Sequence, residues 1–156
     1  MARLFDPYVP TPPGLVRAKL EMGEVTSRDV VFDLGCGDGR VLITAARKYG
    51  ARGVGVELQQ GVVEEAWSRV ADHDLEGKIT ILCQDFMETD LSEATLVILY
   101  LTERTLHALS DKLQELPVGA RVVTHQFPLA GWKHSEQSSW TSSRGEVVPL
   151  FLYLKR

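Results

Sequence analysis

Short hydrophobic runs alternate with segments of helical periodicity along most of the chain. The runs are rich in β-branched residues, as in strands buried on both faces, and they cover residues 29–34, 52–58, 78–83, 93–101 and 120–127. Around them, apolar positions recur every three or four residues and predict helices over residues 15–22, 39–50, 62–71 and 102–113. Strands that alternate with helices predict a mainly parallel sheet with helices on both faces.

Both ends of the chain depart from this alternation. Residues 136–143 and 146–154 have the pattern of two strands, and the Arg-Gly pair between them predicts a tight turn. The sheet is therefore expected to have seven strands and to end in an antiparallel hairpin. Residues 1–14 contain four prolines, which disfavour regular structure and predict an extended arm packed on the body. The whole chain, residues 1–156, is expected to form one α/β domain.

Composition and charge are those of an ordinary soluble globular protein, with 44% hydrophobic and 24% charged residues. The net charge is −4 and the 17 Lys and Arg residues are scattered, which argues against a nucleic acid as the main partner. No apolar stretch approaches the roughly 18 residues of a membrane-spanning helix, and no secretion signal is recognisable. Cys36 and Cys83 lie far apart, outside metal-ligand spacing. We expect no metal, reduced thiols and a cytoplasmic location.

The segment "VVFDLGCGDGRVL" carries the first chemical signal. Its three glycines, Gly35, Gly37 and Gly39, directly follow the first core strand. In open α/β sheets, ligands bind beyond the carboxyl ends of the strands, and glycines there allow the backbone to turn sharply and to approach a ligand. A tight connection between strand and helix without any ligand is the alternative interpretation. Three alternating glycines exceed what such a connection requires, so the pattern favours a ligand.

The residues around these glycines indicate which ligand. A dinucleotide-binding loop has the spacing GxGxxG, but Arg40 stands where its third glycine would be. Asp33 and Asp38 bracket the loop, and two carboxylates would repel a pyrophosphate. The same carboxylates would attract a ligand that carries a sulfonium and an ammonium group. The loop therefore favours S-adenosylmethionine, with S-adenosylhomocysteine as the product.

Two further acids fit this cofactor. Glu57 ends the second strand, 20 residues beyond Gly37, where a carboxylate can accept both ribose hydroxyls. Asp85 follows the third strand and is placed to accept the adenine amino group, while Phe86 packs on the ring. Each acid alone could be an ordinary polar strand end. Their order, with the appropriate strand before each, favours the cofactor interpretation.

Three segments carry a resemblance to a known family: "DVVFDLGCGDGRVLITAARKYGARGVGVEL", "ILCQDFMETDLSEATLVILYL" and "ARVVTHQF". They resemble class I S-adenosylmethionine-dependent methyltransferases. With "PYVPTP" in the arm, the chain looks most like the lysine methyltransferases of the ATP synthase c-subunit and the adenine nucleotide translocase, together with their prokaryotic relatives. The resemblance implies a Rossmann-like fold and methylation of a lysine Nε on a protein substrate.

The resemblance also implies the composition of the site. Tyr8 and Thr11 of the arm would fold over the cofactor, and Tyr100 would lie near the transferred methyl. Tyr8 could instead anchor the arm, and Tyr100 could instead be a core aromatic residue at a strand end. The expected cofactor-binding residues are Tyr8, Thr11, Asp33, Gly35, Cys36, Gly37, Asp38, Gly39, Glu57, Leu58, Asp85, Phe86 and Tyr100.

Methyl transfer to lysine requires an unprotonated amine. Deprotonating a lysine of pKa near 10.4 at pH 7 costs about 4–5 kcal/mol, so the enzyme must desolvate and orient the amine. Tyr100 and His125 are the candidate catalytic residues, because both follow or end strands at the carboxyl edge. His125 could accept a proton or could be a structural residue, and Trp132 could line the pocket or cover the sheet.

Alternative substrates follow from the same cofactor. Many DNA methylases carry an Asn- or Asp-Pro-Pro-aromatic tetrapeptide after the fourth strand, but residues 99–102 read Leu-Tyr-Leu-Thr, which again argues against nucleic acid. A small-molecule methyltransferase and a non-catalytic S-adenosylmethionine-binding module remain open. The first usually adds a substrate lid, for which this chain has little spare length. We expect a monomer or a weak dimer.

Overall fold

The computed structural model describes residues 10–156. Its helices are α1 (Pro13–Met22), α2 (Arg40–Tyr49), α3 (Gln60–Asp72) and α4 (Glu103–Lys112), with 3₁₀ turns η1 (Phe86–Glu88) and η2 (Leu113–Glu115). Its strands are β1 (Val30–Leu34), β2 (Arg52–Glu57), β3 (Ile79–Cys83), β4 (Leu96–Leu99), β5 (Arg121–His125), β6 (Glu136–Thr141) and β7 (Val147–Leu154). Within this part of the chain, no helix has the length and apolar character needed to cross a bilayer.

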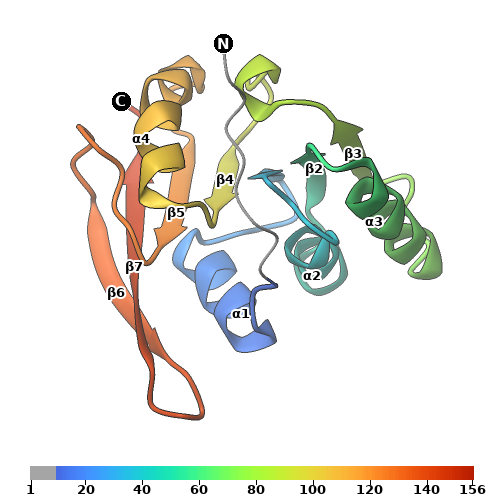
Figure 1. Cartoon of the computed structure of the whole chain (residues 1–156), viewed down its shortest axis with the longest axis horizontal. Coiled ribbons are helices and arrows are strands. Elements are labelled where there is room, and N and C mark those ends of the chain that lie inside the picture. The colour runs from blue at the N-terminus through green and yellow to red at the C-terminus, as the bar shows by residue number, and fades with distance from the viewer. Residues whose placement is uncertain (1–9) are drawn as a thin grey trace.

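The seven strands form one sheet in the order β3-β2-β1-β4-β5-β7-β6. The first five strands of that order run parallel to one another, whereas β7 is antiparallel to both β5 and β6. Figure 1 shows the hairpin of β6 and β7 at the opposite end of the sheet from β3 and α3. The predicted mainly parallel sheet with a C-terminal antiparallel hairpin is therefore confirmed.

Alternate residues of the central strands pack against two separate apolar layers. In β1, Val31 belongs to the layer that α1, α2 and α3 cover, while Phe32 and Leu34 belong to the layer under α4. In β4 all four side chains are fully buried, and Ile98 and Leu99 belong to opposite layers. Burial on both faces explains why these strands are uninterrupted apolar runs in the sequence.

Two element boundaries matter for the site. Gly50 ends α2 with φ 73°, and its N–H donates to the carbonyl of Ala46 at 3.0 Å, as the predicted helix end requires. The predicted fourth strand, residues 93–101, is shorter in the structure. It ends at Leu99 because Thr102 caps α4, its side chain accepting the N–H of Thr105 at 3.3 Å. Tyr100 consequently lies in a loop at the carboxyl edge.

Two glycines of β2 allow α2 and the glycine loop to approach the sheet closely. A Cβ atom at Gly53 would lie 2.8 Å from Cδ2 of Leu42. At Gly55 it would lie 2.7 Å from Sγ of Cys36 and 2.9 Å from Cδ1 of Leu42. Such distances are shorter than van der Waals contact, so the small residues of "RGVGVE" position the loop on which the site is built.

We expect the substitution Gly55→Ala to destabilise the protein. The added methyl group overpacks the contact with Cys36 and Leu42, which typically costs about 1–3 kcal/mol. Chemical denaturation measures the change in the free energy of unfolding. Gly61→Ala in α3 is the matched control, because nothing lies within 4 Å of its added Cβ. Equal stability of the two variants would show that the close approach is not required.

Candidate functional site

A pocket opens at the carboxyl edge of the sheet, where the strand order reverses between β1 and β4. The position is the usual ligand site of open α/β sheets. It brings together eight of the residues selected from the sequence: Thr11, Asp33, Gly35, Cys36, Gly37, Asp38, Glu57 and Tyr100. Val41, Leu101 and Phe127 supply apolar walls that the sequence argument did not identify, although Leu101 and Phe127 are the last residues of predicted strands.

Other selected residues do not line this pocket. Gly39 is the residue before α2, at its N-cap, and Leu58 follows β2 as a half-buried residue. Asp85 caps η1, where its Oδ1 accepts the N–H of Met87 at 2.9 Å, and Phe86 packs on the apolar layer under α4. His125 ends β5, is 3% exposed and does not line the pocket. Tyr8 lies outside the described residues.

The glycine loop has an unusual backbone conformation. Gly35, Gly37 and Gly39 have φ values of 87°, 56° and 82°, in the left-handed region that favours glycine. The N–H groups of Gly35 and Cys36 both donate to the carbonyl of Val56, at 2.7 and 3.0 Å. Burial raises the pKa of the Cys36 thiol, and Asp33 and Glu57 add to this effect. The thiol is therefore protonated and is not a nucleophile.

Glu57 links the end of β2 to the glycine loop. Its side chain is buried, Oε1 accepts the N–H of Gly37 at 3.2 Å, and Oε2 accepts the N–H of Gln59 at 3.0 Å. Each carboxylate oxygen has two lone pairs. Both oxygens therefore retain the capacity to accept a hydroxyl group from a ligand in the pocket.

Asp38 is paired with arginine. Nη2 of Arg40 lies 2.6 Å from Oδ2 of Asp38, and Nε donates to Oδ1 at 3.0 Å. Nη1 of Arg69 is 3.5 Å from the same Oδ2, and Nη1 of Arg40 donates to the carbonyl of Thr11 at 3.0 Å. Asp38 therefore has a cationic partner within the protein. Arg40, noted in the sequence only as a departure from the dinucleotide loop, neutralises it.

Asp33 faces a buried lysine from α1. Lys19 is 1% exposed, and its Nζ donates to the carbonyl of Leu99 at 2.9 Å. Burial lowers the pKa of Lys19 to about 7, against the opposing effect of Asp33. Burial raises the pKa of Asp33 to about 7; the charge of Lys19 opposes this, and Glu57 and Asp38 reinforce it. Each group is thus the main charge that stabilises the other in the pocket.

The sequence argument missed Lys19 because lysines are rarely buried. A signal was nevertheless present. Lys19 follows Leu15 by four residues and Val16 by three, which places it on the apolar stripe of α1. A charged residue on such a stripe indicates a buried partner.

The pocket has a small excess of negative charge. The charged residues that line it are Lys19, Asp33, Asp38, Arg40 and Glu57. Three carboxylates against two cations leave one carboxylate in excess, which suits a ligand with one net positive charge.

Tyr100 and His125 form a stacked pair at the edge of the pocket. Their ring centroids are 3.9 Å apart with an interplanar angle of 29°, and Tyr100 is 39% exposed. Within residues 10–156, the buried Nδ1 of His125 has no hydrogen-bond partner. Burial lowers the pKa of His125 to about 2, and the charge of Lys19 adds to this effect. The imidazole is consequently neutral at physiological pH.

Trp132 lies against the sheet and does not line the pocket. Its Nε1 donates to the carbonyl of Ser110 at 3.1 Å, and its ring meets Tyr153 edge-on with centroids 6.1 Å apart. Of the two interpretations from the sequence, the contacts favour a cover for the sheet.

Comparison with known proteins identifies related chains. The family model described as the ANTKMT methyltransferase domain matches residues 33–136. A protein-lysine N-methyltransferase of Saccharolobus islandicus is 42% identical over 132 residues, which are 83% of this chain and 82% of that protein. The adenine nucleotide translocase lysine N-methyltransferase of Mus musculus is 38% identical over 105 residues. These residues are 66% of this chain but only 45% of the mouse protein.

One solved structure is similar over almost the whole chain. It is described as an RNA methyltransferase from Salinibacter ruber in complex with S-adenosyl-L-homocysteine, with a TM-score of 0.87 and 34% identity over 94% of both chains. The predicted cofactor, S-adenosylmethionine, and the predicted methyltransferase family agree with these matches. The glycine loop, the pocket at the strand-order reversal and these relatives lead to one conclusion: the chain is an S-adenosylmethionine-dependent methyltransferase and belongs to the ANTKMT methyltransferase family.

Proposed function

We propose that this chain is a protein-lysine N-methyltransferase. The observation that carries the proposal is the 42% identity to the Saccharolobus enzyme over 82% of that enzyme's length. The geometry is consistent with it, because Tyr100 lines the pocket together with the buried charges and is itself exposed to solvent. A long lysine side chain can enter such an opening while the rest of its protein stays outside.

In this proposal the chain binds the cofactor through its charged strand ends. S-Adenosylmethionine supplies an electrophilic methyl group on its sulfonium. Asp33 binds the ammonium of the amino-acid portion, and Glu57 accepts hydrogen bonds from the ribose hydroxyls. The glycine loop, which has no side chains at its glycines, contacts the cofactor through its backbone. Asp85, Phe86 and Leu58 contact the adenine ring. Leu58 and Asp85 follow β2 and β3 at the same edge as Glu57, which supports that assignment.

We assign the arm, residues 1–14, to the cover of the cofactor site within a single methyltransferase domain. Pro10 and Thr11 already line the pocket, and the carbonyl of Thr11 accepts a hydrogen bond from Arg40. The predicted role of Tyr8 depends on residues outside the described part of the chain and stays a prediction.

On the acceptor side, Tyr100 orients the lysine amine through its hydroxyl group. Withdrawal of the ammonium from water lowers its pKa, so the proton leaves to solvent before the methyl transfer. A group with a pKa of about 2, as in His125, is too weak a base to take that proton. We therefore assign His125 to the support of the Tyr100 ring by stacking, in place of its predicted role as proton acceptor.

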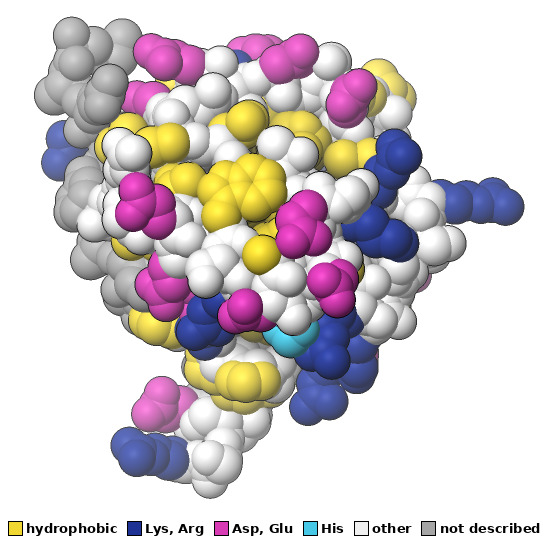
Figure 2. All heavy atoms as spheres, turned by 90° about the vertical axis from the view of Figure 1, so that its right-hand side faces the viewer, with side chains coloured by type: hydrophobic (Ala, Val, Ile, Leu, Met, Phe, Trp, Pro, Cys, Tyr) yellow, Lys and Arg dark blue, Asp and Glu magenta, His cyan; other side chains and the backbone are white. Residues whose placement is uncertain are grey.

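RNA is the second candidate acceptor. The description of the Salinibacter structure favours it, at 34% identity over 94% of both chains. The charge of this chain argues against it, because the net charge is −4. On the face over β3 and α3, acidic side chains lie among the basic ones (Figure 2), and such a mixture does not attract a phosphate backbone strongly.

Transfer of radiolabel from the cofactor distinguishes these acceptors. Purified protein is incubated with labelled S-adenosylmethionine and a cell lysate, then with a lysate whose lysines have been blocked by exhaustive chemical acetylation. We expect protease-sensitive label that disappears when the lysines are blocked, and mass spectrometry should find methylated lysine. Label that is sensitive to ribonuclease, or label in small molecules only, would contradict the proposal.

The substitution Glu57→Gln should weaken cofactor binding. It removes a charged acceptor for the ribose hydroxyls and places an amide NH₂ group against a backbone N–H, where two donors face each other. We expect the free energy of cofactor binding to weaken by about 1–3 kcal/mol. Calorimetric titration with S-adenosylhomocysteine measures the effect. The exposed Glu76→Gln is the control and should bind as wild type. Unchanged affinity of Glu57→Gln would refute the ribose assignment.

The stability of the protein should depend on His125 below neutral pH. The pKa of a histidine in the unfolded chain is near 6.5, whereas burial lowers the pKa of His125 in the folded protein to about 2. The unfolded state therefore binds the proton first, and the stability that is present above pH 6.5 is lost as the pH falls. Between pH 7 and 5 the wild type should lose up to about 2 kcal/mol more than His125→Phe.

Urea denaturation at both pH values measures this difference. His125→Phe keeps an aromatic ring against Tyr100, and His107→Phe, the same substitution at an exposed position, is the matched control. If the free energy of unfolding of wild type and of His125→Phe depended on pH in the same way, the folded state would take up a proton at His125 as readily as the unfolded state does, and the prediction would be wrong.

A further inference from the structure

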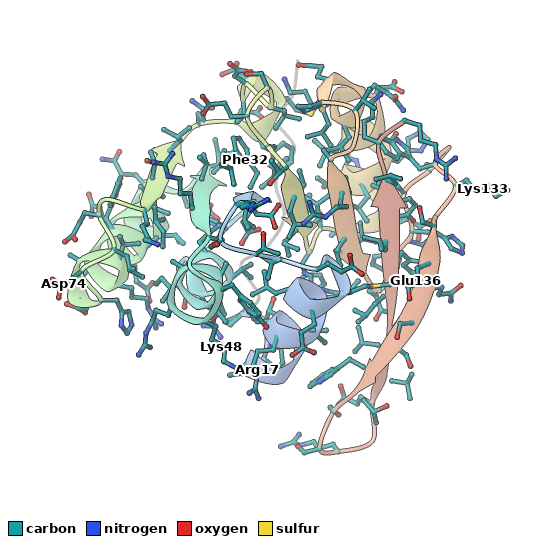
Figure 3. The ribbon with its side chains drawn as sticks, turned by 180° about the vertical axis from the view of Figure 1, so that it is seen from behind. Arg17, Phe32, Lys48, Asp74, Lys133 and Glu136 are labelled. Carbon is teal, nitrogen blue, oxygen red and sulfur yellow. The ribbon has the colours of Figure 1, made fainter. Side chains whose placement is uncertain are left out.

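Lys19 is the one fully buried lysine side chain among the described residues, and its environment is incomplete. Lys19 belongs to α1 and lines the pocket. Arg17, two residues earlier in the same helix, points away from the sheet (Figure 3). Within residues 10–156, the carbonyl of Leu99 is its hydrogen-bond partner. An ammonium has three donors, so donors that Leu99 does not use remain available to a ligand in the pocket.

Asp33 is the complementary charge in the same pocket, but the two groups do not form an ion pair. Among the described residues, no nitrogen of Lys19 lies within 4 Å of a carboxylate oxygen, and no hydrogen bond reaches the carboxylate of Asp33. Separated buried charges are costly unless a further group satisfies both. A ligand with a positive and a negative group close together would do so.

The amino-acid portion of S-adenosylmethionine has this character. Its ammonium and carboxylate are attached to the same carbon atom. Asp33 suits the ammonium, but Asp33, Asp38 and Glu57 would all repel the carboxylate. Arg40 is already engaged by Asp38 and by the carbonyl of Thr11. Lys19 is the other cation of the pocket lining.

We propose that Lys19 binds the α-carboxylate of S-adenosylmethionine and S-adenosylhomocysteine, so that α1 is part of the cofactor site. Lys19 and Asp33 then hold the two charges of the amino-acid portion, and the hydrogen bond to Leu99 sets the position of Nζ at the end of β4. The inference rests on the cofactor of the proposed function but does not depend on the methyl acceptor.

A comparison of two ligands tests this assignment without any measurement of activity. S-Adenosylhomocysteine and decarboxylated S-adenosylhomocysteine differ only in the α-carboxylate. Calorimetric titration of the wild type should show that the decarboxylated ligand binds about ten- to a hundredfold more weakly, as for the loss of a charge-assisted hydrogen bond. Similar affinities of the two ligands for the wild type would overturn the proposal.

Two substitutions then separate recognition of the carboxylate from a structural role. Lys19→Gln removes the charge but keeps a donor for the carbonyl of Leu99, while Lys19→Met removes both. We expect both variants to bind the two ligands with similar affinity. Lys48→Met, on the exposed side of α2 (Figure 3), is the control and should discriminate as wild type does.

The outcomes are distinct. If Lys19→Gln still prefers the ligand with the carboxylate by the wild-type factor, Lys19 only ties α1 to β4 and the proposal is overturned. Thermal unfolding without ligand shows whether each variant is folded. If one variant is unfolded, the other variant and the comparison of the two ligands on the wild type still test the proposal. A wild type that discriminates as expected but methylates no lysine would refute the proposed acceptor and leave the role of Lys19 intact.

Discussion

Burial of a carboxylate at the carboxyl end of β1 is the constraint on which the site depends. Asp33 is 6% exposed, and a charge so far from water must be compensated. The opposing charge comes from Lys19 of α1, the helix that precedes β1 in the chain. The position of α1 against the sheet, with its apolar residues packed on β4 and β5, is therefore also an electrostatic requirement.

The glycine loop depends on a second constraint, which is the approach of β2. The carbonyl of Val56 accepts two loop N–H groups, and Glu57 accepts a third, that of Gly37. Side chains at residues 53 and 55 would prevent this approach. The glycines of β2 and those of the loop thus act together: one set makes room for the loop and the other allows its left-handed backbone.

Local patterns in the sequence predicted most of the fold. The alternation of strands and helices, the closing hairpin and the end of α2 at Gly50 are properties of neighbouring residues, and the structure confirms them. The family was predicted from the same local motifs. The burial of Lys19 was not predicted, because its hydrogen-bond partner, the carbonyl of Leu99, is 80 residues away, and its opposing charge, Asp33, belongs to another element. The adenine side at Asp85 and Phe86 stays a prediction.

Arg40 has a consequence beyond neutralisation. One guanidinium group binds both the carboxylate of Asp38 in the glycine loop and the carbonyl of Thr11. Two equilibria that share a group are thermodynamically linked, and the linkage is reciprocal. If ligand binding alters the contact between Arg40 and Asp38, the contact of Arg40 with the segment that carries Thr11 must affect ligand binding in return. Arg40 thus ties the segment before α1 to the glycine loop.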